Sequence, residues 1–357
     1  MMIGLETAPA AGAVPFDLPA ELAAHEPPEA CGRTRDDVRL LVSRSAADEV
    51  SHHAFTELPD ILLPGDLLVV NNSATLPAAV AVAAASPAPG PLTVHFSTAM
   101  PAGDWLVELR SGRNQDTSPF AGGQPGWRLG LSGGAVLTLT ARFSQRLWHA
   151  RLSTAVIPYL LRHGTPIRYS YVRRAWPIDA YQTVFATWPC SAEMPSAARP
   201  FTPEIVTRLV SRGVMIAPVT LHTGVSSLEG GEDPYPESYH VAAATARLVN
   251  LTRRHGGRVI AAGTTVVRAL ESAALDGGAA AGGPVAASAG WTSHVVTAET
   301  GVVAVDGLLT GLHEPRSTHL WMLAAFAGPA MLARSYLAAA DRGYRWHEFG
   351  DVHLLLP

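Results

Sequence analysis

The sequence predicts a mixed α/β (α+β) protein in which a small β-barrel domain is inserted into an α/β domain. Short β-rich runs crowd into residues 65–152, and helix and strand patterns alternate from residue 153 onward. Crowded short strands are typical of small barrels, and alternating helices and strands are typical of α/β domains. The 357 residues also exceed the length at which a single core usually stops growing. We therefore expect an α/β domain from 1–64 and 153–357, and a barrel from 65–152.

The elements expected before the barrel are few and short. Residues 1–15 are rich in Ala and Pro and predict a loose tail. The run VRLLV at 38–42 predicts a strand, and a short helix is expected near 56–62 because Pro64-Gly65 would end it.

The barrel is expected from six β-rich runs between Asp66 and Leu152. Turns rich in Gly, Pro, Asn and Ser separate these runs. In order, the runs are DLLVVN, PLTVHFS, DWLVELRS, GWRLGLS, AVLTLTARF and LWHARLS.

The alternating region begins with helical patterns at 156–164 and 202–213. The second has Thr202 as its N-cap and Pro203 at its first position, which is the usual chemistry of a helix start. The later elements are expected as strands at 215–222, 258–263, 291–297, 303–310 and 344–356, and as helices at 244–257, 264–275 and 317–328.

The composition excludes several classes of enzyme. All 26 basic residues are Arg, so no lysine exists for a Schiff base, a pyridoxal-phosphate attachment or a P-loop. The net charge of −4 provides no general attraction for nucleic acid. The two cysteines form no CxxC, and the histidines form no HExxH or similar ligand spacing, so we expect no metal. No secretory signal and no run of about 18 apolar residues are present, so we expect a cytoplasmic protein without a membrane segment.

The first candidate site is the junction at Gly263, Thr264 and Thr265, where an apolar strand runs into a helix. Free N–H groups and the dipole at a helix start favour an anion, although Thr also caps many helices without binding anything. Arg268 and Glu271 lie three residues apart on the polar face of that helix, and the sequence alone favours a surface ion pair between them.

The second candidate site is the stretch from Asp306 to Thr318, in which a strand ends and another helix begins. Arg316 would lie at the positive end of that helix, where a cation is unfavourable unless a ligand anion is present. A solvated loop arginine is the alternative. His313 is an acid–base candidate because histidine titrates near neutral pH.

Two further stretches carry polar groups. His222 lies at the end of a strand. The loop that follows it carries Glu229, Glu232, Asp233 and Glu237 and is most simply a solvated acidic loop. A basic aromatic cluster is either a grip for RNA or a solvated connection. Its members are Arg168, Tyr169, Tyr171, Arg173, Arg174 and Trp176.

Taken in order, the motifs resemble the S-adenosylmethionine:tRNA ribosyltransferase-isomerase family of queuosine biosynthesis. The matching stretches are FDLPAELA from Phe16, RLLV from Arg39, GDLLVVNN from Gly65, YQTVFA from Tyr181, GRVIAAGTT from Gly257, DGLLT from Asp306, His313, Pro315, Ser317-Thr318, AFAG from Ala325, Tyr344-Arg345 and Gly350-Asp351. The resemblance spans nearly the whole chain, from Phe16 to Leu355.

The resemblance implies a transferase that uses S-adenosylmethionine as a ribosyl donor. The family moves the ribosyl unit onto 7-aminomethyl-7-deazaguanine in tRNA, isomerises it to an epoxycyclopentanediol, and releases adenine and methionine. On this basis we expect catalytic groups at His222, Glu237, Asp306 and His313, and acceptor contacts at Arg173, Arg174, Tyr181 and Gln182. We expect donor contacts at Gly263, Thr264, Thr265, Arg268, Arg316, Ser317 and Thr318. The expected state is a monomer or a homodimer.

The chain also departs from the family pattern. Pro200 stands where the family has a His, the stretch PYPE ending at Glu237 replaces a Met-His-x-Glu run, and Ala74 and Ala79 replace two arginines. Fewer arginines weaken phosphate contacts, so tRNA is one acceptor partner to test and a small molecule is the other. A non-catalytic relative that binds S-adenosylmethionine or RNA is the alternative of another class.

Overall fold

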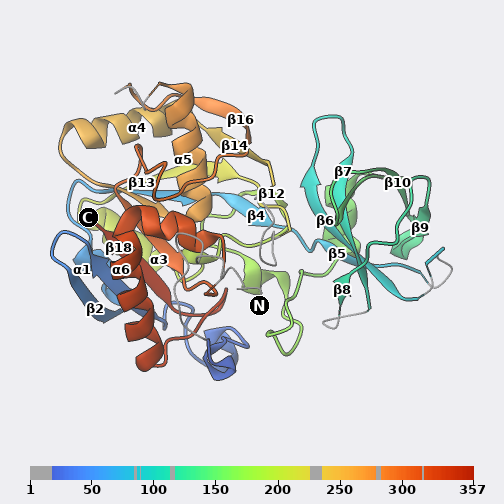
Figure 1. Ribbon diagram of the computed structural model, residues 1–357, viewed down its shortest axis with the longest axis horizontal. Coiled ribbons are helices and arrows are strands. Elements are labelled where there is room, and N and C mark those ends of the chain that lie inside the picture. Colours follow the sequence, from blue (N-terminus) through green and yellow to red (C-terminus); the bar gives the residue numbers. More distant parts are fainter. Residues whose placement is uncertain are drawn as a thin grey trace, which may run out of the picture.

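A computed structural model describes residues 18–83, 87–88, 90–112, 117–225, 235–278, 283–315 and 317–357. It consists of a large α/β body and a smaller body of curved β-strands at its side (Figure 1). Strands β4 (Ser73–Thr75) and β12 (Trp188–Ser191) pair with each other in the region between the two bodies (Figure 1).

The large body is built on a nine-stranded sheet with the order β16-β14-β13-β3-β15-β17-β18-β1-β2. The four central strands β13, β3, β15 and β17 run parallel, so their carboxyl ends share one edge. The strands are β1 (Arg39–Arg44), β2 (Glu49–Ala54), β3 (Leu67–Asn71), β13 (Met215–Leu221), β14 (Glu237–Val241), β15 (Val259–Ala262), β16 (Ser288–Thr292), β17 (Gly307–Gly311) and β18 (Val352–Leu356).

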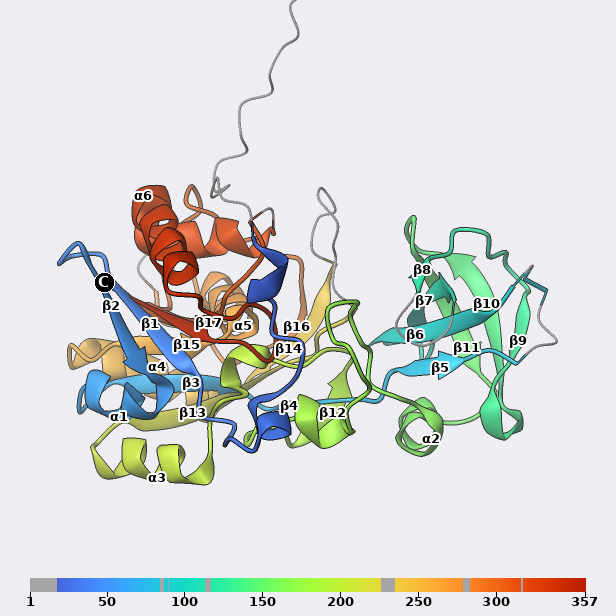
Figure 2. The same cartoon turned by 90° about the horizontal axis from the view of Figure 1, so that it is seen from below.

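Helices cover both faces of this sheet, so each central strand is buried on both sides. In β3, Leu67 and Val69 belong to one apolar core, and Leu68 and Val70 belong to another. This alternation follows from the two-residue period of a strand. The first core contains residues of α4 (Ala243–Arg254), α5 (Thr264–Asp276) and α6 (His319–Asp341), and the second contains residues of α1 (Leu58–Ile61) and α3 (Pro203–Ser211), on opposite sides of the sheet (Figure 2).

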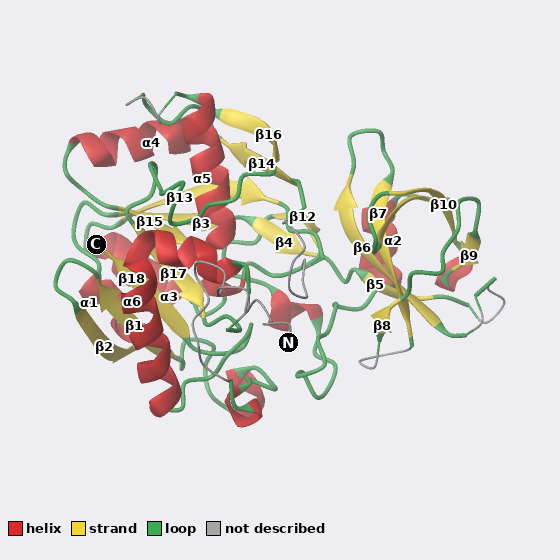
Figure 3. Ribbon diagram, viewed as in Figure 1, coloured by secondary structure: helices red, strands yellow, loops and turns green. Residues whose placement is uncertain are grey.

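The smaller body is a sheet that curls on itself, with the order β5-β6-β7-β11-β10-β9 and with β8 paired to β7. The bridge between Val82 and Leu131 joins its two outer edges, and Trp148 is 2% exposed inside it. Figure 3 shows the strands as a rounded group. They are β5 (Ala79–Ala81), β6 (Leu92–Ala99), β7 (Trp105–Ser111), β8 (Ser118–Pro119), β9 (Arg128–Gly130), β10 (Val136–Arg142) and β11 (Leu147–Leu152).

Two elements differ from the expected boundaries at residues 65 and 152. Strand β3 pairs with β13 and β15 in the large sheet, because its side chains are apolar on both faces. Helix α2 (Val156–His163) instead packs Tyr159 and Leu160 into the core of the barrel. The barrel strands proper therefore begin at β5, and the barrel core extends past residue 152.

The remaining helical elements are single 3-10 turns. They are Ala20–Leu22, Pro28–Cys31, Phe55–Glu57, Ser132–Gly134, Ile178–Tyr181 and Ser196–Ala198.

Helix α6 is the one described helix that is long and apolar enough to cross a membrane. Gly328, with φ of 71°, and Pro329 interrupt its helical geometry. Leu320, Leu323 and Leu332 are at most 1% exposed and lie in the core on the sheet. Packing within the protein thus accounts for part of its apolar composition.

Candidate functional site

A cavity of about 650 Å³ lies at the edge where the carboxyl ends of the central parallel strands meet the barrel. Open α/β sheets bind their ligands at this edge. The lining residues are Thr75, Arg110, Thr117, Arg146, 166–171, Tyr181, 192–197, Thr223, 263–265, 310–314, 317–319, His347 and Glu348.

The start of α5 forms one wall of the cavity. Gly263 has φ of 106°, a conformation that residues with a side chain rarely adopt, and it lets β15 turn directly into the helix. The hydroxyl of Thr265 lies 3.3 Å from the amide nitrogen of Asn71, which is fully buried at the end of β3. The N–H groups of this helix start and the two threonine hydroxyls therefore present donors to a ligand.

The end of β17 carries His313 into the cavity. Its ring atom Nε2 lies 2.8 Å from the hydroxyl of Thr310, and its ring stacks on that of His319 with the centroids 4.4 Å apart. The backbone N–H of His313 donates to the hydroxyl of Tyr336. Burial first, and then the neighbouring histidines, hold the pKa of His313 well below its usual value. Burial likewise lowers the pKa of His319 to about 4. Both rings are therefore neutral at pH 7 and can accept a proton or a hydrogen bond.

The segment before β18 lies at the same edge, because β18 runs antiparallel to β17 and Val352 pairs with Gly311. This register places His347 and Glu348 beside the residues that follow β17. His347 has φ of 74°, which is unusual for a residue with a side chain, and such strain is often found at functional sites. Burial lowers the pKa of His347 to about 4.

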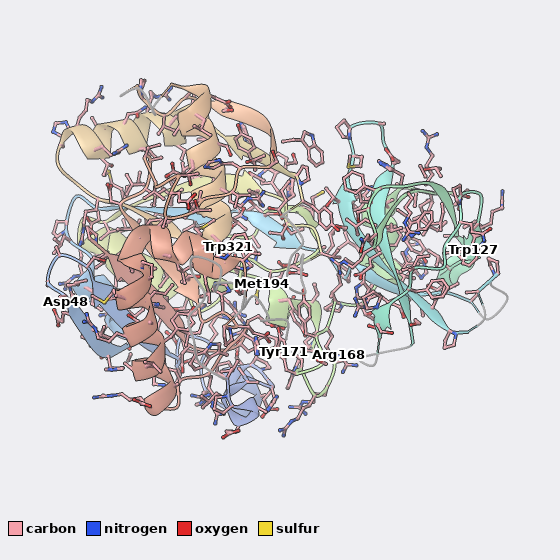
Figure 4. All side chains as sticks on the ribbon, in the orientation of Figure 1. Asp48, Trp127, Arg168, Tyr171, Met194 and Trp321 are labelled. Carbon is pink, nitrogen blue, oxygen red and sulfur yellow. The ribbon has the colours of Figure 1, made fainter. Side chains whose placement is uncertain are left out.

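Aromatic side chains from the connection after α2 complete the wall next to His347. The ring of Tyr171 stacks on His347 at 3.9 Å and on Tyr169 at 5.7 Å. The hydroxyl of Tyr171 donates to Glu348, and the hydroxyl of Tyr169 donates to Glu193. Figure 4 shows Tyr171 with its neighbours Arg168 and Met194 between the two bodies.

The barrel contributes charge to the opposite wall. Arg110 and Arg146 both donate to the buried carboxylate of Glu108, at 2.9 and 3.0 Å. Burial raises the pKa of Glu108, and the two guanidinium groups oppose that rise. Two cations on one carboxylate leave this wall with a net positive charge.

Seven residues predicted for the site line the cavity, although they come from separate parts of the chain. The predicted acid–base candidate, the three residues of the α5 start, the helix cap and one acceptor contact are among them. They are His313, Gly263, Thr264, Thr265, Ser317, Thr318 and Tyr181.

Arg268 and Glu237 lie outside the lining and pair with each other. Arg268 also donates to the carbonyl of Thr292 at 3.1 Å and is 9% exposed. Burial raises the pKa of Glu237, and Arg268 opposes that rise. The expected surface pair of Arg268 with Glu271 is wrong, because Glu271 is 2% exposed and accepts from the N–H groups of Val303 and Ala304.

Three other predicted residues lie outside the lining and are held by structural hydrogen bonds. Asp306 precedes β17, at the far end from the cavity, and accepts from the N–H of Val259 at 2.8 Å. Gln182 binds the backbone N–H and carbonyl of Thr75, at 3.0 and 2.8 Å. His222 lies 2.7 Å from the hydroxyl of Ser73, directly before the lining residue Thr223.

Apart from Arg268, three arginines were expected to contact the donor or the acceptor, and the structure describes two of them. Arg173 and Arg174 are exposed and lie outside the lining, and Arg174 stacks on Trp176 at 4.0 Å and pairs with Glu26 at 3.6 Å. Of the cluster to which they belong, Arg168, Tyr169 and Tyr171 reach the cavity. Arg316 and the acidic residues Glu229, Glu232 and Asp233 lie outside the described residues.

Sequence reasoning left Glu193, His347 and Glu348 out of the predicted site. For the last two a signal existed, since they directly precede the final strand of the sheet, whose start meets the end of β17. Within the described ranges, no group of three His, Cys, Asp or Glu side chains could hold a metal ion.

The chain matches the pattern of a known family over residues 13–355, and the family is described as queuosine biosynthesis protein. The chain belongs to this family. S-adenosylmethionine:tRNA ribosyltransferase-isomerase from Anaeromyxobacter sp. is 37% identical to this member over 95% of the chain and 97% of the relative. The protein of the same name from Symbiobacterium thermophilum is 33% identical, over 96% and 98%.

A solved structure is similar to this family member along its whole length. The S-adenosylmethionine tRNA ribosyltransferase from Thermotoga maritima superimposes with a TM-score of 0.53 at 28% identity, covering 96% of this chain and 99% of that one. The predicted family, the predicted class of enzyme and the α/β fold with an inserted barrel are thereby confirmed.

Proposed function

We propose that this enzyme transfers the ribosyl unit of S-adenosylmethionine to 7-aminomethyl-7-deazaguanine in tRNA and isomerises it to the epoxycyclopentanediol, releasing adenine and methionine. The observation that carries the proposal is the cavity at the strand ends, which joins a helix start, neutral histidines and a barrel wall with two arginines. The relatives named for this reaction match the chain over nearly their full length. The proposed location is the cytoplasm.

The α5 wall suits the methionine part of the donor. The methionine carboxylate is an anion, and the N–H groups and hydroxyls of Thr264 and Thr265 are donors at the positive end of a helix. The N–H of Gly263 already donates to the carbonyl of Leu309, so this residue contributes a close approach of the backbone. Ser317 and Thr318, at the start of α6, add two hydroxyls nearby. These five residues are the proposed donor contacts.

His313 suits the role of proton acceptor. The sulfonium of S-adenosylmethionine makes the adjacent ribose carbon more acidic, so a neutral base nearby can take a proton from it. The depressed pKa of His313 keeps it unprotonated at pH 7, and the hydroxyl of Thr310 fixes its ring at 2.8 Å.

The barrel wall suits the anionic backbone of an acceptor nucleotide. Arg110 and Arg146 carry one positive charge beyond the carboxylate of Glu108 that they share, and Arg168 lies on the same cavity. Arginine is the usual partner of phosphate because its planar group donates two hydrogen bonds. A tRNA acceptor therefore has a place to bind even though the net charge of the chain is −4.

The decisive experiment is incubation with S-adenosylmethionine, with and without tRNA carrying 7-aminomethyl-7-deazaguanine, while adenine and methionine are measured by mass spectrometry. Release that requires the tRNA supports the proposal. Release without tRNA favours the small-molecule acceptor, and no release despite binding of S-adenosylmethionine favours a non-catalytic relative. His313→Asn, which keeps a hydrogen-bonding group but removes the base, is expected to abolish release, whereas exposed Arg212→Gln should retain it.

A further inference from the structure

One wall of the cavity combines stacked rings with a half-buried carboxylate, Glu348. Tyr169, Tyr171 and His347 form a column in which Tyr171 is tilted by 13° from Tyr169 and by 10° from His347. The hydroxyl of Tyr171 donates to one oxygen of Glu348. Flat aromatic faces beside a carboxylate are a common setting for an organic cation.

Glu348 has no counter-charge in direct contact. Among the described residues it forms no ion pair with an arginine, and Tyr171 is the one side chain that donates to it. A buried carboxylate usually has a charged partner, because removing it from water is costly. Burial raises the pKa of Glu348, and the hydrogen bond from Tyr171 and the charge of Arg199 oppose that rise. Arg199 itself forms its ion pair with Glu29, so it acts on Glu348 without touching it.

Two hydroxyls on the same cavity also lack a partner. Tyr181 is 5% exposed and Thr75 is 4% exposed, and neither hydroxyl has a hydrogen-bond partner in the described structure. Both residues line the cavity, and the backbone of Thr75 is held by Gln182. Buried polar groups are rarely left unsatisfied, so these two hydroxyls beside the cavity are candidates for a hydrogen bond to a bound polar group.

We propose that Glu348, with Tyr171 and Tyr181, forms the subsite that binds the protonated aminomethyl group of the acceptor base. The carboxylate supplies the counter-charge, Tyr171 orients it, and the unpaired hydroxyl of Tyr181 accepts an N–H of the amine. The deazaguanine ring lies near the aromatic column. This subsite selects acceptors that carry an amine over those that do not, and it rests on the proposed function of the enzyme.

The test compares two free bases by calorimetry at pH 7: 7-aminomethyl-7-deazaguanine and 7-methyl-7-deazaguanine, which lacks the amine. The wild-type enzyme is expected to bind the amine-bearing base at least tenfold more tightly. Glu348→Gln should reduce this preference to less than threefold, and Tyr181→Phe should reduce it by threefold or more. Glu204→Gln is the matched control, because Glu204 is an exposed carboxylate outside this cavity, and it should keep the full preference.

The outcomes separate the subsite from its alternatives. A wild-type enzyme without the preference, or a preference that survives in both Glu348→Gln and Tyr181→Phe, overturns the proposal. If Glu348→Gln fails to fold, as judged by circular dichroism, Tyr181→Phe decides alone. A tenfold loss of S-adenosylmethionine affinity in Glu348→Gln with an intact amine preference assigns the carboxylate to the donor and also overturns it.

The same titrations keep this inference separate from the proposed function. The binding of the free bases is read without turnover, so it does not depend on adenine release. An amine preference that requires Glu348, in an enzyme that releases no adenine, would sustain the subsite and refute the proposed reaction. Adenine release without any amine preference would sustain the proposed reaction and refute the subsite.

Discussion

Replacing Arg268 with Met should destabilise the protein far more than replacing an exposed arginine. The Arg268 side chain is 11% exposed, and it pairs with Glu237 while donating to the carbonyls of Thr292 and His294 at 3.1 and 3.3 Å. Without it, the Glu237 carboxylate, 15% exposed, keeps the N–H of Gly224 at 3.2 Å as its one hydrogen-bond donor among the described residues. Breaking a buried pair in this way costs about 3–5 kcal/mol.

Urea unfolding followed by far-UV circular dichroism at pH 7.5 and 25 °C measures this loss. Arg212→Met is the matched control, since Arg212 pairs with Asp60 at 3.0 Å and both side chains are 51% exposed. An exposed pair contributes at most about 1 kcal/mol, so the control should unfold almost as the wild type does.

A second substitution shows whether the unpaired charge is the cause. Adding Glu237→Gln to Arg268→Met should recover at least half of the lost free energy, because a neutral amide needs no counter-charge. A loss below about 1 kcal/mol in Arg268→Met would refute the reasoning. A double variant no more stable than the single one would refute it as well.

Three further outcomes are expected. Gly263→Ala should cost about 1–2 kcal/mol in urea unfolding and weaken S-adenosylmethionine binding in calorimetry, because φ is 106° there; unchanged values would contradict the role of this turn. Trp148→Ala should cost about 3–5 kcal/mol in the same unfolding assay, since the ring is 2% exposed in the barrel core, and a cost under about 1 kcal/mol would speak against that packing. Burial lowers the pKa of His95 and of His353 to about 3, so near and below pH 6.5 these two histidines bind protons in the unfolded chain but not in the folded one. The free energy of unfolding should therefore fall by about 1 kcal/mol for each ring between pH 7.5 and pH 5.5. A His353→Gln variant with the same pH dependence as the wild type would count against this explanation.

The parts of the fold that could be predicted are those set by local pattern. Short apolar runs between turn residues predicted the strands, and runs with capping residues predicted the helices. In α3, for example, the hydroxyl of the capping residue Thr202 accepts the N–H of Ile205. The pattern of β3 was ambiguous, because a run of apolar residues suits a barrel strand as well as a central parallel strand. Its place in the large sheet depends on pairing with Met215 and Val259, more than 140 residues away.

The candidate site was predictable where it follows directly from strand ends. Gly263, Thr264, Thr265 and His313 come immediately after β15 and β17, and all four line the cavity. Burial could not be read from sequence, so Arg268 was interpreted as a surface or donor contact although it lies within the protein. The wall of Tyr171, His347 and Glu348 depends on stacking between segments about 175 residues apart, which no local pattern reports.

The pairing of β18 with β1 also has a consequence for how the chain folds during synthesis. Strand β1 ends at Arg44 but lies between β2 and β18, and β18 ends at Leu356. Ribosomes add about 5–20 residues per second, so β1 waits roughly 15–60 s for its neighbour to emerge. The barrel strands and α2 occupy one continuous stretch from Ala79 to His163 and can fold during this interval. The edge of β1 that β18 covers therefore stays unpaired, and open to wrong pairing with other strands, until the last strand leaves the ribosome.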